Sequence, residues 1–271
     1  MSDQSGWVSN TGDQLSELKV LAESKTLLSD YKFASSVEQN TLVYDCEKLL
    51  PQISSRDGRR AVMAELGRAL LSGPGIVAFK GMYPDTAIVD RVSNVYWEII
   101  EEQHARGEAK GDHYAKPGSN DRVWNVQEKL ALRDPDAFVD YYANDFISLI
   151  ATAWLGPAYQ ITTQVNVVNP GGDAQQPHRD YHLGFLTDEQ AFDYPTHVHL
   201  LSPVLTLQGA VAHTNMPRET GPTMYLPHSQ KMVSGYVAWR NPVIRNYFAE
   251  NFAQLPLQKG DGAFFNPAVF H

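Results

Sequence analysis

Cysteine, long apolar runs and clustered positive charge are all scarce in this sequence, and each absence narrows the possible functions. Cys46 is the only cysteine among 271 residues. One thiol excludes both an intrachain disulfide and a thiolate metal cluster, which fits a reducing compartment. The longest apolar run, residues 146–155, is about half the length that a membrane-spanning helix needs. The first residues also lack the basic start and apolar stretch of a signal peptide. We therefore expect a cytoplasmic protein with no membrane partner.

Basic residues are fewer than acidic residues, and they are scattered along the chain. Lys and Arg number 22 against 31 Asp and Glu, which gives a formal net charge of −9. They form no block along the chain, so the electrostatic footprint of a nucleic-acid-binding protein is missing. A hydrophobic fraction of 43% is enough to bury a sizeable core in one large domain or two small ones. We expect a small molecule as the partner, and nothing indicates an oligomeric state.

Helical patterns dominate the first half of the chain. Residues 1–56 are polar and mixed, with one possible helix over 12–28, and we predict an N-terminal extension packed on the core. Asp85 as a cap, and Gly107 and Gly156 as stops, mark helix ends further on. The spacing of apolar residues predicts a buried strand over 76–83 and helices over 57–75, 85–107 and 134–156.

Strand-like segments dominate the second half, from Tyr159 onward. They are short, apolar and separated by Pro and Gly, and they cover residues 159–168, 196–213, 223–229 and 260–271. Helices followed by strands predict an α+β fold. Short strands with long connections fit a double-sheet jelly roll better than a parallel sheet.

The most informative stretch is "QQPHRDYHLGF", residues 175–185, in which His178, Asp180 and His182 alternate. On a strand these three side chains would point to one side. An imidazole and a carboxylate two residues apart can chelate one metal ion, as in the 2-His-1-carboxylate facial triad that binds non-haem Fe(II). The third ligand must come from a distant strand, and His271, which ends an apolar run, is the candidate. Alone, the pair is a weak signal, because a surface His near an Asp explains it equally well.

Three segments together resemble the phytanoyl-CoA dioxygenase (PhyH-like) family of Fe(II)- and 2-oxoglutarate-dependent oxygenases: "HRD" at 178–180, "GPTMYLPHSQ" at 221–230 and "GDGAFFNPAVFH" at 260–271. The resemblance begins with "GPGIVAFKGMYPD" and covers about residues 73–271. It implies a double-stranded β-helix (jelly-roll or cupin-like) core flanked by N-terminal helices, with the dioxygenase domain over 57–271. The implied reaction hydroxylates a C–H bond of a small organic substrate, consumes 2-oxoglutarate and O₂, and releases succinate and CO₂.

The same resemblance implies that His178, Asp180 and His271 bind Fe(II). Halogenating relatives lack the carboxylate at the middle position, so the presence of Asp180 favours hydroxylation. In the family, the strand before the His-x-Asp motif contacts 2-oxoglutarate. Gln164 and Asn166, two of four polar residues on one face of that segment, are our candidates for this contact. The alternative is that this face is the solvent side of an edge strand.

Family members continue past the third ligand to an Arg that binds the distal carboxylate of 2-oxoglutarate. A guanidinium suits this task because it meets a carboxylate with two parallel hydrogen bonds. No Lys or Arg follows Lys259 in this sequence. We therefore expect the natural chain to continue beyond His271, and the alternative is a pseudo-enzyme that has lost co-substrate binding.

Two other function classes stay open at this point. His197 and His199 form a His-x-His pair typical of cupin-like metal enzymes, although no Glu follows at the spacing of that site. We expect this pair to alternate along a strand beside the pocket, and His182 to line the pocket or bond a neighbour. The other class is a non-catalytic β-barrel that only binds a ligand. Fe(II) binding with 2-oxoglutarate turnover would distinguish the oxygenase from both.

Overall fold

A five-stranded sheet lies at the centre of the structure, a computed structural model that describes residues 6–9, 11–109, 118–184 and 186–271. In spatial order its strands are β1 (Ser36–Glu38), β2 (Thr41–Asp45), β3 (Ile76–Lys80), β9 (Gly262–Phe265) and β6 (Gln208–Val211). β2 and β3 run parallel, and the other neighbours are antiparallel. β3 and β9 are buried almost throughout, which explains why both are continuous apolar runs in the sequence.

Two smaller sheets complete the strand structure. β4 (Asn120–Val123) pairs with β5 (Val165–Val168), and β7 (Met224–Tyr225) pairs with β8 (Ala253–Gln254), both antiparallel. In the part of the chain that the structure describes, the strands close into no barrel. The mixture of helices and strands confirms the α+β class, whereas the double-stranded β-helix stays a prediction.

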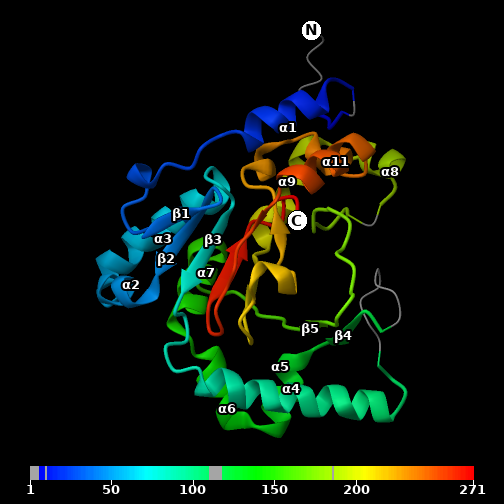
Figure 1. Ribbon diagram of the computed structural model, residues 1–271. Helices are drawn as coiled ribbons and strands as arrows, with labels where there is room; N and C mark the ends of the chain where they lie inside the picture. Colours follow the sequence, from blue (N-terminus) through cyan, green and yellow to red (C-terminus); the bar gives the residue numbers. More distant parts are fainter. Residues whose placement is uncertain (1–5, 10, 110–117, 185) are drawn as a thin grey trace.

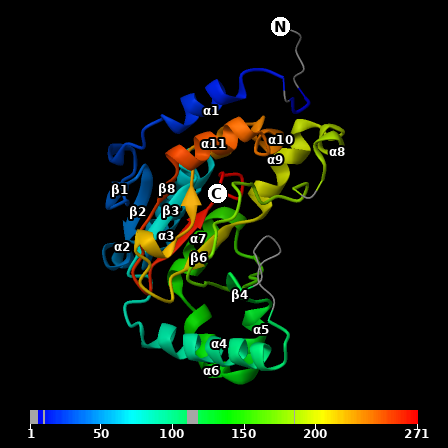
Figure 2. The same cartoon turned by 45° about the vertical axis from the view of Figure 1, so that its right-hand side comes forward.

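Helices form layers on both sides of this strand structure. In the view of Figure 1, α4, α5 and α6 lie below the sheet, and α1, α9 and α11 lie above it. Figure 2 shows α1 and α11 side by side, and the two helices are in contact. The α-helices and 3₁₀ turns of the described residues are α1 (Gln14–Ala22), η1 (Leu28–Asp30), α2 (Cys46–Ile53), α3 (Arg56–Leu71), α4 (Ala87–Ala105), α5 (Val126–Arg133), α6 (Pro135–Tyr142), α7 (Asp145–Leu155), α8 (Asp188–Phe192), α9 (Thr196–Leu205), η2 (Arg218–Thr220), η3 (Ser229–Lys231), α10 (Gly235–Ala238) and α11 (Pro242–Asn251).

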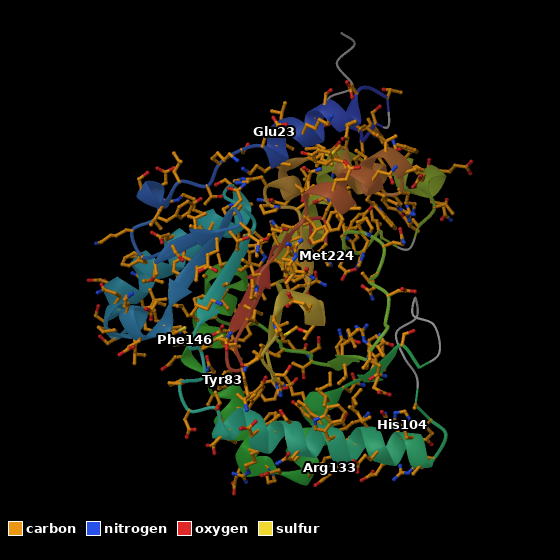
Figure 3. All side chains as sticks on the ribbon, viewed as in Figure 1. Glu23, Tyr83, His104, Arg133, Phe146 and Met224 are labelled. Atoms are coloured by element: carbon orange, nitrogen blue, oxygen red, sulfur yellow. The ribbon has the colours of Figure 1, made fainter. Side chains whose placement is uncertain are left out.

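The largest apolar cluster joins the sheet to the helices that cover it. Phe79 of β3 is fully buried in this cluster, and its ring lies 5.7–5.9 Å from the rings of Tyr44, Phe146 and Phe264. Such aromatic pairs stabilise a core beyond the area they bury. Figure 3 shows Phe146 beside the sheet, and Tyr83 between the sheet and α4. These contacts hold the central strands, and β9 leads directly into the segment that ends at His271.

Local signals correctly predicted α1, α3 and α4, whereas α2 and α5 were not predicted. The side chain of Asp85 accepts a hydrogen bond from the N–H of Ala87 at the start of α4, and Gly107 has φ +68° just after its end. The predicted single helix over 134–156 is wrong, because it divides into α6 and α7. Asn144 begins α7, since its side chain accepts hydrogen bonds from the N–H groups of Phe146 and Ile147.

The prediction of strands throughout 196–213 is also wrong. Its first half is helix α9, and only β6 is a strand. A short apolar run does not by itself distinguish a strand from a helix. Among the α9 side chains that the structure describes, His199 and Pro203 are buried; they are four residues apart, which is helical spacing.

The segment 1–56 was expected to be an extension packed on the core. In the structure it contributes β1 and β2 to the main sheet, with β2 parallel to β3. Among the described residues, no helix combines the length and the apolar character that crossing a bilayer requires.

Candidate metal centre

Three of the predicted site residues lie together, although they come from distant parts of the chain. His178 and Asp180 lie between β5 and α8, and His271 follows β9. The His178 Nε2 atom is 3.5 Å from Oδ1 of Asp180, and the His271 Nε2 atom is 3.7 Å from Oδ2. All three ligand atoms lie within 4.8 Å of one another. In the described ranges, no other group of three or more His, Cys, Asp or Glu residues meets this spacing.

Backbone hydrogen bonds join the two segments at the site itself. The N–H of His178 donates to the carbonyl of His271 (3.0 Å), and the N–H of His271 donates to the carbonyl of His178 (3.2 Å). This exchange is the pattern of a hydrogen-bonded antiparallel pair. The N–H of Asp180 also donates to the carbonyl of Pro267 (3.3 Å). The main chain therefore sets the separation of the ligand-bearing segments.

The strand predicted for the His-x-Asp motif is not formed, because residues 178–182 have an irregular backbone. The alternation on which the prediction depended is nevertheless present. Arg179 and Tyr181 are buried, with exposed fractions of 2% and 7%, whereas Asp180 and His182 are exposed. The segment thus places Asp180 on an outward side and its two neighbours on a core-facing side.

Each imidazole is oriented by a backbone carbonyl. Nδ1 of His178 donates to the carbonyl of Gln176 (2.8 Å), and Nδ1 of His271 donates to the carbonyl of Val269 (2.9 Å). In a neutral imidazole, a proton on Nδ1 leaves the lone pair on Nε2. Both Nε2 atoms face Asp180, so both rings present a metal-binding nitrogen to the same point.

Gln208 of β6 orients the Asp180 carboxylate, a role that no pattern in the sequence predicts. Its Nε2 donates to Oδ2 of Asp180 at 2.6 Å. Its buried Oε1 has no hydrogen-bond partner among the described residues. The reverse orientation of the amide would place two oxygens 2.6 Å apart, so the donor side must face Asp180.

Asp180 is ionised in this environment. Burial raises its pKa, but the neighbouring His271 imidazole, the Gln208 amide and the His178 imidazole together lower it well below the usual range of a carboxyl group. Half of its side chain is exposed. The site therefore combines two imidazole nitrogens with one anionic carboxylate oxygen that a ligand can reach.

Gln164 and Asn166 lie on the exposed face of the segment around β5, while Val165 and Val167 pack on the core. Asn166 accepts a hydrogen bond from Nδ2 of Asn120 on β4 (3.2 Å). The sequence suggested that this polar face is buried and lines a cavity. In the structure, both side chains are exposed instead. Their contact with 2-oxoglutarate stays a prediction.

The His-x-His pair does not form a chelating site. His197 and His199 lie on helix α9, where residues two apart point to different sides. His197 is exposed, whereas His199 is fully buried and its Nε2 donates to the carbonyl of Ala191 (3.0 Å). The expectation that they alternate along a strand beside the pocket is wrong. His182, also expected to line the pocket, is exposed.

The segment 221–230 contributes a buried imidazole with a structural role. His228 is 4% exposed and adopts φ +70°. Nζ of Lys231 donates to its Nδ1 (2.7 Å), and its Nε2 donates to Oγ1 of Thr26 (3.0 Å), so the neutral form links this segment to the N-terminal residues. Burial and the Lys231 charge lower the pKa of His228 to about 4.

We therefore expect stability to fall in mildly acidic solution. Above pH 6.5, His228 is neutral in both the folded and unfolded chains, and its contribution is fully present. Between about pH 6.5 and 4 the unfolded chain binds a proton that the folded chain does not, which lowers the free energy of unfolding by up to about 3 kcal/mol. Urea unfolding at a series of pH values measures this loss. His228→Asn, which tolerates the positive φ, should reduce the pH dependence, and an unchanged curve would contradict the assignment.

Comparison with known proteins places these observations in context. The model of the family described as phytanoyl-CoA dioxygenase (PhyH) matches residues 71–271. No curated protein matches the chain. A Salmonella typhimurium LT2 protein provisionally designated an oxidoreductase aligns over 84% of this chain and 68% of its own, with 13% identity and a TM-score of 0.48. The non-haem α-ketoglutarate-dependent epimerase SnoN of nogalamycin biosynthesis aligns over 78% and 76%, with 19% identity and a TM-score of 0.45.

Proposed function

Because the chain belongs to the phytanoyl-CoA dioxygenase family, we propose that it is an Fe(II)- and 2-oxoglutarate-dependent oxygenase that hydroxylates a C–H bond of a small organic substrate. The observation that supports this most directly is the convergence of His178, Asp180 and His271. Two imidazole nitrogens and one carboxylate are the donor set of the facial triad, which leaves coordination positions for substrates. The carboxylate is ionised, and the hydrogen bonds of both Nδ1 atoms to backbone carbonyls leave both Nε2 atoms directed at it, as metal binding requires.

In this proposal the residues of the chain bind and orient the metal ion and the substrates, and the oxidation chemistry comes from Fe(II), 2-oxoglutarate and O₂. Bound Fe(II) would support a reaction in which 2-oxoglutarate loses CO₂ to give succinate, while one atom of O₂ enters succinate and the other becomes the product hydroxyl. His178 and His271 would bind the ion through Nε2, and Asp180 through the carboxylate that Gln208 holds. Gln164 and Asn166 are the proposed contacts to 2-oxoglutarate, from the exposed face beside β5.

Anaerobic spectroscopy tests this proposal without knowledge of the substrate. Fe(II) and 2-oxoglutarate added to the protein should produce a metal-to-ligand charge-transfer band that neither gives alone. Release of succinate after O₂ is admitted, measured across a panel of small organic acids, amines and thioesters, would then identify the substrate class. A protein that binds no Fe(II) would contradict the proposal. Fe(II) binding without 2-oxoglutarate binding would favour a pseudo-enzyme.

A further inference from the structure

A buried arginine lies directly behind the metal-binding residues. Arg179 stands between His178 and Asp180 in the sequence, and its side chain points to the opposite, core-facing side. It is 2% exposed and is the largest of the fully buried side chains. Arg179 therefore packs in the core directly behind His178 and Asp180, two of the three proposed ligands.

Arg179 contacts the segment that carries the third ligand. Its guanidinium lies between two aromatic rings, 4.5 Å from the centroid of Phe270 and 4.6 Å from that of Tyr236. Its Nη2 donates to the carbonyl of Ser229 at 2.6 Å. The hydroxyl of Ser229 in turn accepts a hydrogen bond from the N–H of Phe270 (2.8 Å), the residue before His271. One residue, Ser229, therefore binds both ligand-bearing segments.

The fit around this guanidinium is close. A Cβ atom added at Gly235 would lie 2.4 Å from Nη2 and 2.5 Å from Cζ of Arg179. A glycine at this position lets the backbone approach the guanidinium directly. The charged group is thus confined by Gly235, Tyr236 and Phe270, and it has little room to move without moving the ligand-bearing segments.

Stability does not account for a cation at this place. Nε and Nη1 of Arg179 have no hydrogen-bond partner among the described residues, and no salt bridge involves the residue there. An arginine guanidinium stays protonated in proteins, so this buried group carries a positive charge. A buried charge without a carboxylate is costly, and an apolar side chain of similar volume is often at least as stable. The contacts it makes, and not the burial itself, must explain its presence.

We propose that Arg179 is a positioning residue for the metal ligands, which holds the His178–Asp180 segment and the Phe270–His271 segment against the Ser229 carbonyl. The inference rests on the proposed function, because it concerns the same metal. A displacement of the guanidinium would move His178 and Asp180 through the chain and His271 through Phe270. Groups that orient metal ligands from behind typically contribute about 10- to 100-fold to metal affinity.

Co(II) titration separates positioning from simple core packing. Wild type, Arg179→Met and Arg179→Lys are titrated with Co(II), followed by its visible d–d absorption, and each metal-free protein is melted separately. We expect Arg179→Met to melt no lower than wild type when metal-free, yet to bind Co(II) at least about tenfold more weakly, with an altered spectrum. Arg179→Lys should regain part of the affinity, because an ammonium can reach the Ser229 carbonyl but does not stack as a plane.

The matched control is Arg240→Met. Arg240 also stacks on an aromatic ring, Trp239 (4.2 Å), but it donates to the Asp188 carboxylate and to the carbonyls of Gly184 and Leu186, none of which is a proposed ligand. The Arg240→Met protein should bind Co(II) with the affinity of wild type. Equal affinity in wild type and Arg179→Met would overturn the inference. If Arg179→Met fails to fold, the Co(II) affinity of Arg179→Lys is compared with wild type instead, and equal affinity would again overturn the inference. A wild-type protein that binds no Co(II) would instead contradict the proposed function.

Discussion

Removal of either imidazole from the candidate metal centre should remove most of the Fe(II) affinity and all turnover while the fold is retained. His178→Ala or His271→Ala leaves two donors, which hold the ion much more weakly than three. Because changes to groups behind the ligands already cost about 10- to 100-fold in affinity, loss of a ligand should cost more than about 100-fold. Anaerobic equilibrium dialysis measures the bound iron, and circular dichroism with thermal melting measures the fold.

His182 provides the matched control for this experiment. It lies two residues beyond Asp180, is exposed and is outside the group whose ligand atoms converge. His182→Ala should therefore keep full iron stoichiometry. Full stoichiometry in His178→Ala would show that the site is wrong. Loss of iron on changing His199 but not His178 would favour the cupin-like alternative, although His199 is buried and its ring is hydrogen-bonded to Ala191.

Local sequence signals predicted only part of the helices and part of the strands. The ends of α3, α4 and α7 follow from nearby residues such as Ser55, Asp85 and Gly156, whose effects act within one turn. The boundary between α6 and α7 was missed because Asn144 lies inside an otherwise helical pattern, where its capping role depends on its conformation. α9 was missed because an apolar run has the same composition in a buried helix and in a strand.

The sequence pattern predicted the three side chains that converge at the candidate site, but not the residues that hold them in place. His178, Asp180 and His271 belong to motifs with recognisable spacing. Gln208 reaches Asp180 only because β6 and β9 are neighbours in the sheet, a contact across 28 residues that no local pattern specifies. The hydrogen bond from Arg179 to the Ser229 carbonyl is also beyond local prediction, because it joins residues 50 positions apart. An arginine next to a metal ligand would ordinarily be interpreted as a solvated charge.

Replacement of Asp180, the proposed carboxylate ligand, should abolish hydroxylation while some binding of Fe(II) and 2-oxoglutarate persists. Asp180→Gly removes the anionic donor and opens a coordination position, while both imidazoles are still held by the carbonyls of Gln176 and Val269. We expect hydroxylation to be lost completely, because the remaining two-nitrogen site no longer has the facial triad. Weak binding of Fe(II) with 2-oxoglutarate should persist, seen as a charge-transfer band of low intensity in anaerobic spectra.

Comparison of Gln208→Met with Asp180→Gly separates the loss of the Asp180 carboxylate from the loss of its orientation. The substitution removes the 2.6 Å hydrogen bond to Asp180 and keeps the approximate volume of the side chain on β6. Iron affinity should fall about 10- to 100-fold with turnover retained at saturating Fe(II), because the carboxylate is still present but less well oriented. Asp180→Gly should show no turnover at any Fe(II) concentration. Hydroxylation that is unchanged in Asp180→Gly would mean that Asp180 is not a ligand, and that the polar contact with Gln208 serves the fold alone.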